Sequence, residues 1–122
     1  MTATAKAAID VRPVVTLFKA LADETRLRIV ALLAHGELCV CHVESALALS
    51  QPHVSRHLSI LRAAGVVEAR RRRSWVHYRL ARQDDPDRKR QLGALVRGFA
   101  AHELLRADVA RLLASQGPRS CT

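Results

Sequence analysis

Apolar residues recur at the three- and four-residue spacing of α-helices over most of the chain, so the pattern predicts a mainly helical protein. Proline and capping side chains mark the expected helix starts, at Pro13, at Asp23 and at Ser50 with Gln51-Pro52 behind it. The first two expected helices run from Pro13, with apolar Val14, Leu17, Phe18 and Leu21, and from Asp23 to Gly36, with Leu27, Val30, Ala31 and Ala34. The next two run from Cys39 to Leu47, with Val43, Ala46 and Leu47, and from Ser50 to Gly65, with Val54, Leu58 and Leu61. One last helix is expected from Asp84-Asp85-Pro86-Asp87 to Gly117-Pro118, with apolar Leu92, Leu95, Val96, Phe99, Leu104, Leu105, Val109 and Leu112.

After Gly65 the apolar period changes from helical to two, which predicts a β-hairpin. Val67 starts the first strand, and the alternation resumes from Val76 to Leu80. The run Arg72-Arg73-Ser74 is expected at the tip, where no Asn-Gly or Gly-Gly pair fixes the register.

Two of the expected helices are joined by only three residues, Ala48-Leu49-Ser50, and the second has a polar, basic outer face. Such a pair followed by a hairpin predicts a winged helix-turn-helix, with four helices, the hairpin and a final helix in that order. We expect one winged helix-turn-helix domain over 13–115, preceded by a flexible N-terminal segment, 1–12, and followed by a C-terminal tail, 116–122. A length of 122 residues fits a single domain.

Charge narrows the range of partners. The chain has 20 Lys and Arg against 11 Asp and Glu, a formal charge of +9, which favours a polyanionic partner. From Glu44 to Arg82 there are eight arginines against two acids, a net charge of +6, on the helix-turn-helix and hairpin. This concentration of arginine predicts binding to the phosphates of double-stranded DNA. No apolar run or leader pattern indicates a membrane span or signal peptide, so we expect a cytoplasmic protein.

The second helix of the pair is expected to enter the major groove and the hairpin to contact the backbone or a minor groove. The DNA-binding residues predicted on these two elements are Gln51, His53, Ser55, Arg56, Ser59, Arg71, Arg72 and Arg73. His57 is open to packing, phosphate contact or base reading. Trp75 is interpreted as hairpin packing.

Two of the three cysteines, Cys39 and Cys41, stand one residue apart at the expected start of the short third helix. An odd cysteine count with this spacing argues against a disulfide framework and suits thiols that bind a soft metal. On an ideal helix residues two apart point about 200° away from each other. We therefore expect that one ion bound by both sulfurs would bend or unwind the first turn, and so disturb the recognition helix. Two small buried apolar residues are the alternative interpretation.

Three segments together resemble the ArsR/SmtB family of metal-responsive repressors: Glu37-Leu-Cys-Val-Cys41, Leu49-Ser-Gln-Pro-His-Val-Ser-Arg-His-Leu-Ser-Ile-Leu-Arg-Ala-Ala-Gly65, and Trp75-Val-His-Tyr-Arg-Leu80. The resemblance spans roughly Val14 to Leu113. It implies a homodimer built on the first and last helices, repression of a metal-resistance operon, and release from the operator when metal binds.

In the arsenic-sensing branch, the cysteines that match Cys39 and Cys41 bind As(III) or Sb(III), with a third cysteine three residues after the second. This chain has Glu44 there. The resemblance therefore implies a two-thiol site, either completed by His42, Glu44 or Cys121, or suited to a methylated arsenical.

Other functions stay open at this point. The zinc sensors of the family place ligands on the last helix, where this chain has His102, Glu103 and Asp108 but no second histidine at the required spacing. A regulator whose cysteines respond to oxidants is a further alternative. Catalysis is not expected, since no nucleophile–base order or phosphate loop is present.

Overall fold

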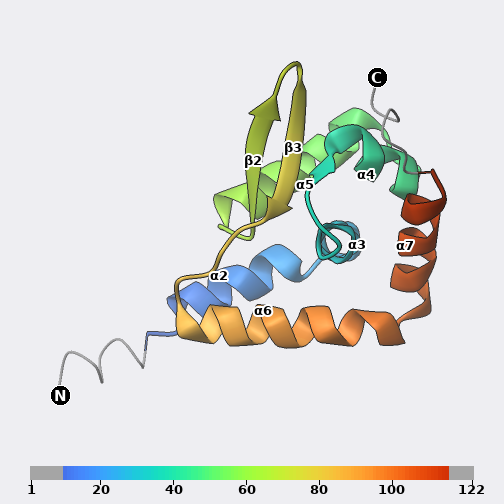
Figure 1. Ribbon diagram of the computed structural model, residues 1–122. Coiled ribbons are helices and arrows are strands. Elements are labelled where there is room, and N and C mark those ends of the chain that lie inside the picture. Colours follow the sequence, from blue (N-terminus) through green and yellow to red (C-terminus); the bar gives the residue numbers. More distant parts are fainter. Residues whose placement is uncertain (1–9, 116–122) are drawn as a thin grey trace.

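The structure is a computed structural model that describes residues 10–115, and it is mainly helical with one small sheet, as the apolar pattern predicts (Figure 1). The helices are α2 (Arg12–Leu21), α3 (Glu24–Leu33), α4 (Val40–Leu47), α5 (Gln51–Ala63), α6 (Pro86–Gly98) and α7 (Glu103–Ser115), with a 3-10 turn η1 (Phe99–Ala101) between the last two. The strands are β1 (Leu38–Cys39), β2 (Val67–Arg72) and β3 (Trp75–Leu80).

Side-chain caps begin the helices where the sequence places them. The Asp23 carboxylate accepts from the backbone N–H of Arg26 at 3.0 Å and begins α3. The Ser50 hydroxyl accepts from the backbone N–H of His53 at 3.4 Å and begins α5. Each cap satisfies a donor that the first turn leaves without a partner.

Helix α3 lies at the centre of the molecule, with α2, α6, α7 and α4 around it (Figure 1). Its side chains Ile29 and Leu32 are fully buried, together with Leu17 of α2 and Leu58 and Leu61 of α5. One continuous core therefore joins α5 to the rest of the molecule.

The sheet has three strands in the order β1-β3-β2, one more than the sequence predicted. Strand β1 pairs antiparallel with β3, with Leu38 opposite Tyr78 and Cys39 opposite His77. The hairpin closes with the two-residue turn Arg73-Ser74. Arg73 takes a left-handed backbone with φ of 60°, in the place where a glycine or asparagine would normally supply that conformation.

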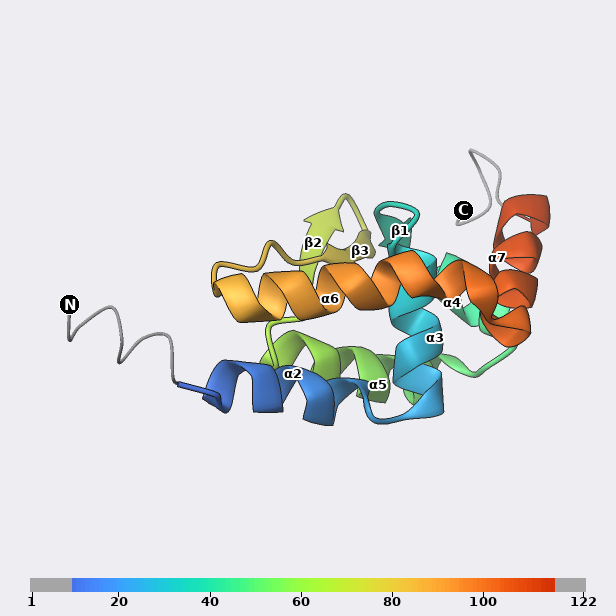
Figure 2. The same cartoon turned by 90° about the horizontal axis from the view of Figure 1, so that it is seen from below.

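The prediction of one long last helix is wrong. The chain breaks after Gly98, passes through η1 and turns into α7, which packs against α3 and α4 (Figure 2). This turn buries Phe99, Leu105 and Leu112 in the core. A straight continuation of α6 would carry the α7 side chains away from α3 and α4 and expose them, which explains the break. Within the described residues no helix is long and apolar enough to cross a membrane.

Candidate DNA-binding surface and cysteine site

The recognition helix α5 presents a polar face that is organised by its own side chains. Gln51, Arg56 and Ser59 are exposed, whereas His53 and Ser55 are half-buried. The Gln51 side-chain amide donates to the Ser55 hydroxyl at 2.7 Å, one turn away. Gln51 is therefore held along the helix face, oriented before it meets any ligand.

His57 points inward and connects α5 to the start of α3. Its Nδ1 lies 3.3 Å from a guanidinium nitrogen of Arg26 and 3.8 Å from a carboxylate oxygen of Asp23. Burial lowers the pKa of His57, and the nearby Asp23 carboxylate opposes that shift. Of the roles left open for His57, the structure favours packing, because only 9% of the residue is exposed.

The wing carries its arginines in two environments. Arg70 and Arg72 both reach Glu37, at 3.2 and 3.3 Å, so one carboxylate from the loop before β1 offsets part of their charge. Arg71 and Arg73 are exposed with no carboxylate within ion-pair distance among the described residues. The positive charges of Arg71 and Arg73 at the tip are therefore not offset by a neighbouring carboxylate. The charge of Arg72, which is also predicted to contact DNA, is partly offset by Glu37. This pairing could not be predicted from the sequence, because Glu37 lies more than thirty residues before the wing.

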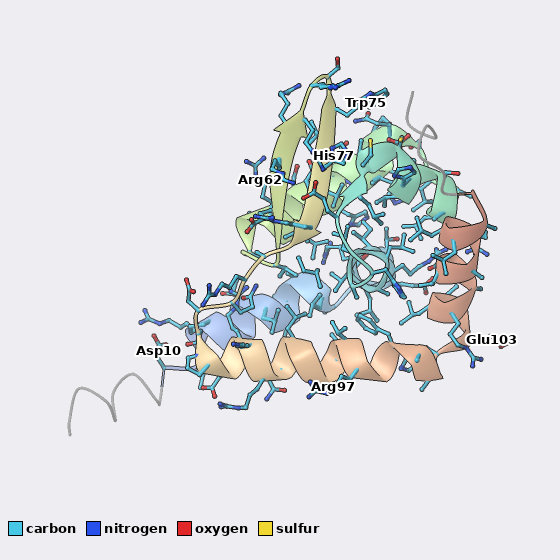
Figure 3. The ribbon with its side chains drawn as sticks, in the orientation of Figure 1. Asp10, Arg62, Trp75, His77, Arg97 and Glu103 are labelled. Atoms are coloured by element: carbon cyan, nitrogen blue, oxygen red, sulfur yellow. The ribbon has the colours of Figure 1, made fainter. Side chains whose placement is uncertain are left out.

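Two labelled residues fix the direction of the wing. Trp75 lies near its free end and His77 further down β3, toward the body of the protein (Figure 3). Trp75 stands opposite Arg72 in the hairpin and is 39% exposed.

The two cysteines lie on different elements and their sulfur atoms meet. Cys39 ends β1 with an extended backbone, φ −67° and ψ 146°, and Cys41 is the second residue of α4. The Cys41 Sγ lies 3.3 Å from the Cys39 Sγ. The prediction that helix geometry keeps the sulfurs apart is wrong, because Cys39 precedes the helix. The first turn of α4 is intact with the sulfurs already together.

The surroundings of the sulfurs are largely desolvated. Cys39 is 1% exposed, and burial lowers the pKa of the neighbouring His42, with a further contribution from His77. Burial also raises the pKa of Glu44, which stands where a third cysteine was expected. Both shifts favour the uncharged forms of these side chains beside the site.

No three His, Cys, Asp or Glu side chains between residues 10 and 115 are grouped closely enough to hold a metal ion. Neither His42 nor Glu44 therefore completes a three-ligand set with the cysteines in this structure. Cys121, the other predicted third ligand, lies outside the described residues. Asp108, which a zinc site on the last helix would use, is instead buried and bound by Arg28 at 2.8 and 2.9 Å.

A family model for bacterial regulatory proteins of the arsR family matches residues 23–69, the part of the chain that contains both cysteines and the recognition helix. The arsenic resistance transcriptional regulator ArsR1 of Pseudomonas putida is 46% identical over 106 residues, which cover 84% of this chain and 79% of that protein. The chain belongs to the ArsR family. The arsenical resistance operon repressor of Escherichia coli is 57% identical over 68 residues, covering 55% of this chain and 58% of that protein.

A solved structure has the same fold. The homodimeric winged helix-turn-helix DNA-binding domain of a possible ArsR-family transcriptional regulator from Mycobacterium bovis superposes with a TM-score of 0.63 at 37% identity, covering 83% of this chain and 89% of that domain. These comparisons confirm the winged helix-turn-helix fold and the ArsR resemblance read from the sequence. Helix α5 is accordingly the recognition helix and β2–β3 the wing of a DNA-binding transcriptional regulator.

Proposed function

We propose that this ArsR-family protein is a metalloid-responsive repressor that binds operator DNA as a homodimer in the cytoplasm. As(III) or Sb(III), or a methylated arsenical, binds Cys39 and Cys41 and releases the protein from DNA. The observation that carries the proposal is the 3.3 Å separation of the two sulfurs. The names of the two relatives, an arsenic resistance regulator and an arsenical resistance repressor, support the choice of ligand.

The sulfur separation favours a trivalent metalloid over a tetrahedral ion. With metal–sulfur bonds of about 2.3 Å, two sulfurs 3.3 Å apart subtend an angle of about 90° at a shared ion. A trivalent arsenic or antimony centre carries a lone pair and holds its bonds near right angles. Zinc prefers a wider, tetrahedral angle and four ligands. The cysteine pair therefore suits the metalloid with little rearrangement.

DNA binding is assigned to the face of α5 and to the wing. Base reading is assigned to Gln51, Ser55 and Arg56, because Gln and Arg side chains suit adenine and guanine edges. His53 and Ser59 flank them on the same helix. The exposed Arg71 and Arg73, with Arg72 beside them, are placed to contact phosphates or a narrow minor groove.

The positions of the cysteines supply a route from ligand to DNA. Cys39 belongs to β1, which pairs with wing strand β3, and Cys41 belongs to α4, which leads into the recognition helix. One ion bound to both sulfurs ties the base of the wing to the first turn of α4. A ligand that prefers one relative placement of these elements shifts the population toward it, by no more than its differential affinity.

The homodimer is assigned to α2 and α6, which lie side by side (Figures 1 and 2). Val15 and Phe18 of α2 are 41% and 50% exposed and lie three residues apart, on one face of the helix, so together they offer an apolar patch to a partner. The homodimeric relative from Mycobacterium bovis supports this state.

A second candidate function rests on the same site. Hydrogen peroxide would oxidise the free Cys39 thiol to a sulfenic acid, with two electrons passing to the peroxide and one water released.

The test begins with a duplex selected from a random library by the wild-type protein. Labelled duplex bound to protein is titrated with As(III), Sb(III), a methylated arsenical, Zn²⁺ and hydrogen peroxide. We expect release by the metalloids, and intact DNA binding without release in Cys39→Ser and Cys41→Ser. Full release of both variants by metalloid would exclude this site, and release by peroxide alone would favour the second candidate. The Cys121→Ser variant reports whether the tail supplies a ligand.

A further inference from the structure

The end of the recognition helix is built as a fixed turn. The backbone N–H of Val66 donates to the carbonyl of Leu61 at 2.9 Å, and that of Gly65 donates to Arg62 at 3.0 Å. Gly65 has a left-handed φ of 75°. These two bonds and the left-handed glycine form a Schellman motif, which satisfies two of the last carbonyls of α5. The carbonyl of Ala64 is left to another partner.

That partner comes from the start of α6. The Arg88 guanidinium donates through Nη2 to the Ala64 carbonyl at 2.7 Å and through Nε to the side-chain oxygen of Gln83 at 2.9 Å. The Gln83 amide donates in turn to the carbonyls of Gly65 and Ala81, each at 2.9 Å. Two side chains thus hold the turn that follows the recognition helix.

The backbone of Arg88 is fixed at the start of its own helix, α6. Arg88 is the third residue of α6, and its backbone N–H donates to the capping carboxylate of Asp85 at 2.9 Å. Its guanidinium packs over Gly65, where an added Cβ would lie 3.5 Å from Nη2. A cation at the C-terminal end of a helix is also favoured by the helix dipole.

We propose that Arg88, oriented by Gln83, is a positioning residue that fixes the angle of the recognition helix α5 relative to α6. Helix α6 packs on α2, so this contact links the face assigned to the dimer with the face assigned to DNA. Two recognition helices of a dimer must meet half-sites about 34 Å apart, so a small change of angle misplaces both. The proposal rests on DNA binding by a dimer but is independent of the cysteine site.

The competing role for Arg88 is a direct phosphate contact. Its Nε and Nη2 donors already serve Gln83 and Ala64, and the side chain is half-buried. Loss of a phosphate contact would weaken binding to every duplex and reduce the salt dependence by about one unit. A positioning residue changes discrimination between sequences instead.

The experiment compares Arg88→Met with Arg88→Lys and with the control Arg106→Met. Arg106 is an exposed residue of α7, outside the surfaces assigned to DNA and to the dimer, and its replacement makes the same change of charge. Affinities for the library-selected duplex and for an unrelated duplex are measured by fluorescence anisotropy at several salt concentrations. Circular dichroism and light scattering establish that each variant is folded and dimeric.

We expect Arg88→Met to bind the selected duplex about 10-fold more weakly, as loss of charge-assisted hydrogen bonds would cause, with little change for the unrelated duplex and an unchanged salt slope. Arg88→Lys should recover only part of the loss, and Arg106→Met should match the wild type. Gln83→Leu keeps the charge of Arg88 and should lose discrimination in the same direction, so it carries the test if Arg88→Met does not fold. Equal losses on both duplexes, a smaller salt slope, or unchanged discrimination in Arg88→Met and Gln83→Leu would overturn the proposal. Failure of the wild type to select any duplex would instead contradict the DNA-binding function.

Discussion

Replacing Asp108 by Asn should destabilise the protein, because it removes a buried charge on α7 that two arginines share. The Asp108 carboxylate is fully buried, accepts two hydrogen bonds from Arg28 of α3 and pairs with Arg111 of its own helix. Arg111 in turn donates to the Ala46 carbonyl of α4 at 2.9 Å. One carboxylate therefore fastens α7 to both helices that it covers.

The expected loss of unfolding free energy depends on how exposed the two arginine partners of Asp108 are. The Arg28 side chain is only 16% exposed, so the variant leaves a buried guanidinium without its counter-charge. Breaking a buried pair by removing one partner costs about 3–5 kcal/mol of unfolding free energy. The Arg111 side chain is 50% exposed, and a pair of that kind adds less than about 1 kcal/mol. Asn retains one acceptor, so we expect a loss near the lower end, about 3 kcal/mol.

Urea unfolding followed by circular dichroism gives the free energy directly. The control is Glu103→Gln, which removes an exposed acid at the start of α7 and should cost less than about 1 kcal/mol (Figure 3). The double variant Arg28→Leu with Asp108→Leu should recover most of the stability, because apolar replacement of a buried pair is often neutral. A loss for Asp108→Asn no larger than that of Glu103→Gln would refute this reasoning.

Three further predictions concern DNA binding and pH. Arg56→Ala should weaken binding to the selected duplex by about 1–3 kcal/mol in a gel-shift titration, and an unchanged affinity would show that the reading face of α5 is misassigned. Burial lowers the pKa of His57 below its ordinary 6.5, so the unfolded chain binds more protons than the folded one as pH falls below that value, and stability falls with it. Urea midpoints at about pH 7.5 and about pH 5.5 should differ less in His57→Gln than in the wild type. Glu37→Gln releases Arg70 and Arg72 and should raise affinity for an unrelated duplex about 3-fold at low salt, with a steeper salt dependence; anisotropy that shows no gain would mean that Glu37 does not limit the wing.

Features set by neighbouring residues could be predicted from the sequence. The caps Asp23 and Ser50, the short turn before α5 and the period-two strands depend on contacts within a few residues, and the structure has each of them. The buried face of α5 also follows its apolar spacing. Patterns within a few residues were therefore enough to predict the helix-turn-helix and the hairpin that follows it.

Features that depend on contacts between distant parts of the chain could not be predicted from the sequence. Strand β1 is two residues long and exists because β3 offers it a partner, so Cys39 was assigned to a helix that begins one residue later. The break between α6 and α7 brings Leu105 and Leu112 into the core and Asp108 against Arg28, eighty residues earlier in the chain. Helical periodicity continues through such a break and gives no sign of the change in direction.

The central claim is that Cys39 and Cys41 together hold the metalloid, and X-ray absorption at the arsenic edge on protein loaded with arsenite tests it most directly. The account predicts one arsenic per chain with at least two sulfur neighbours in the wild type. It also predicts that Cys39→Ser and Cys41→Ser each lose a sulfur neighbour together with arsenite-induced release of DNA. One arsenic per chain with an unchanged sulfur count in both variants would contradict it.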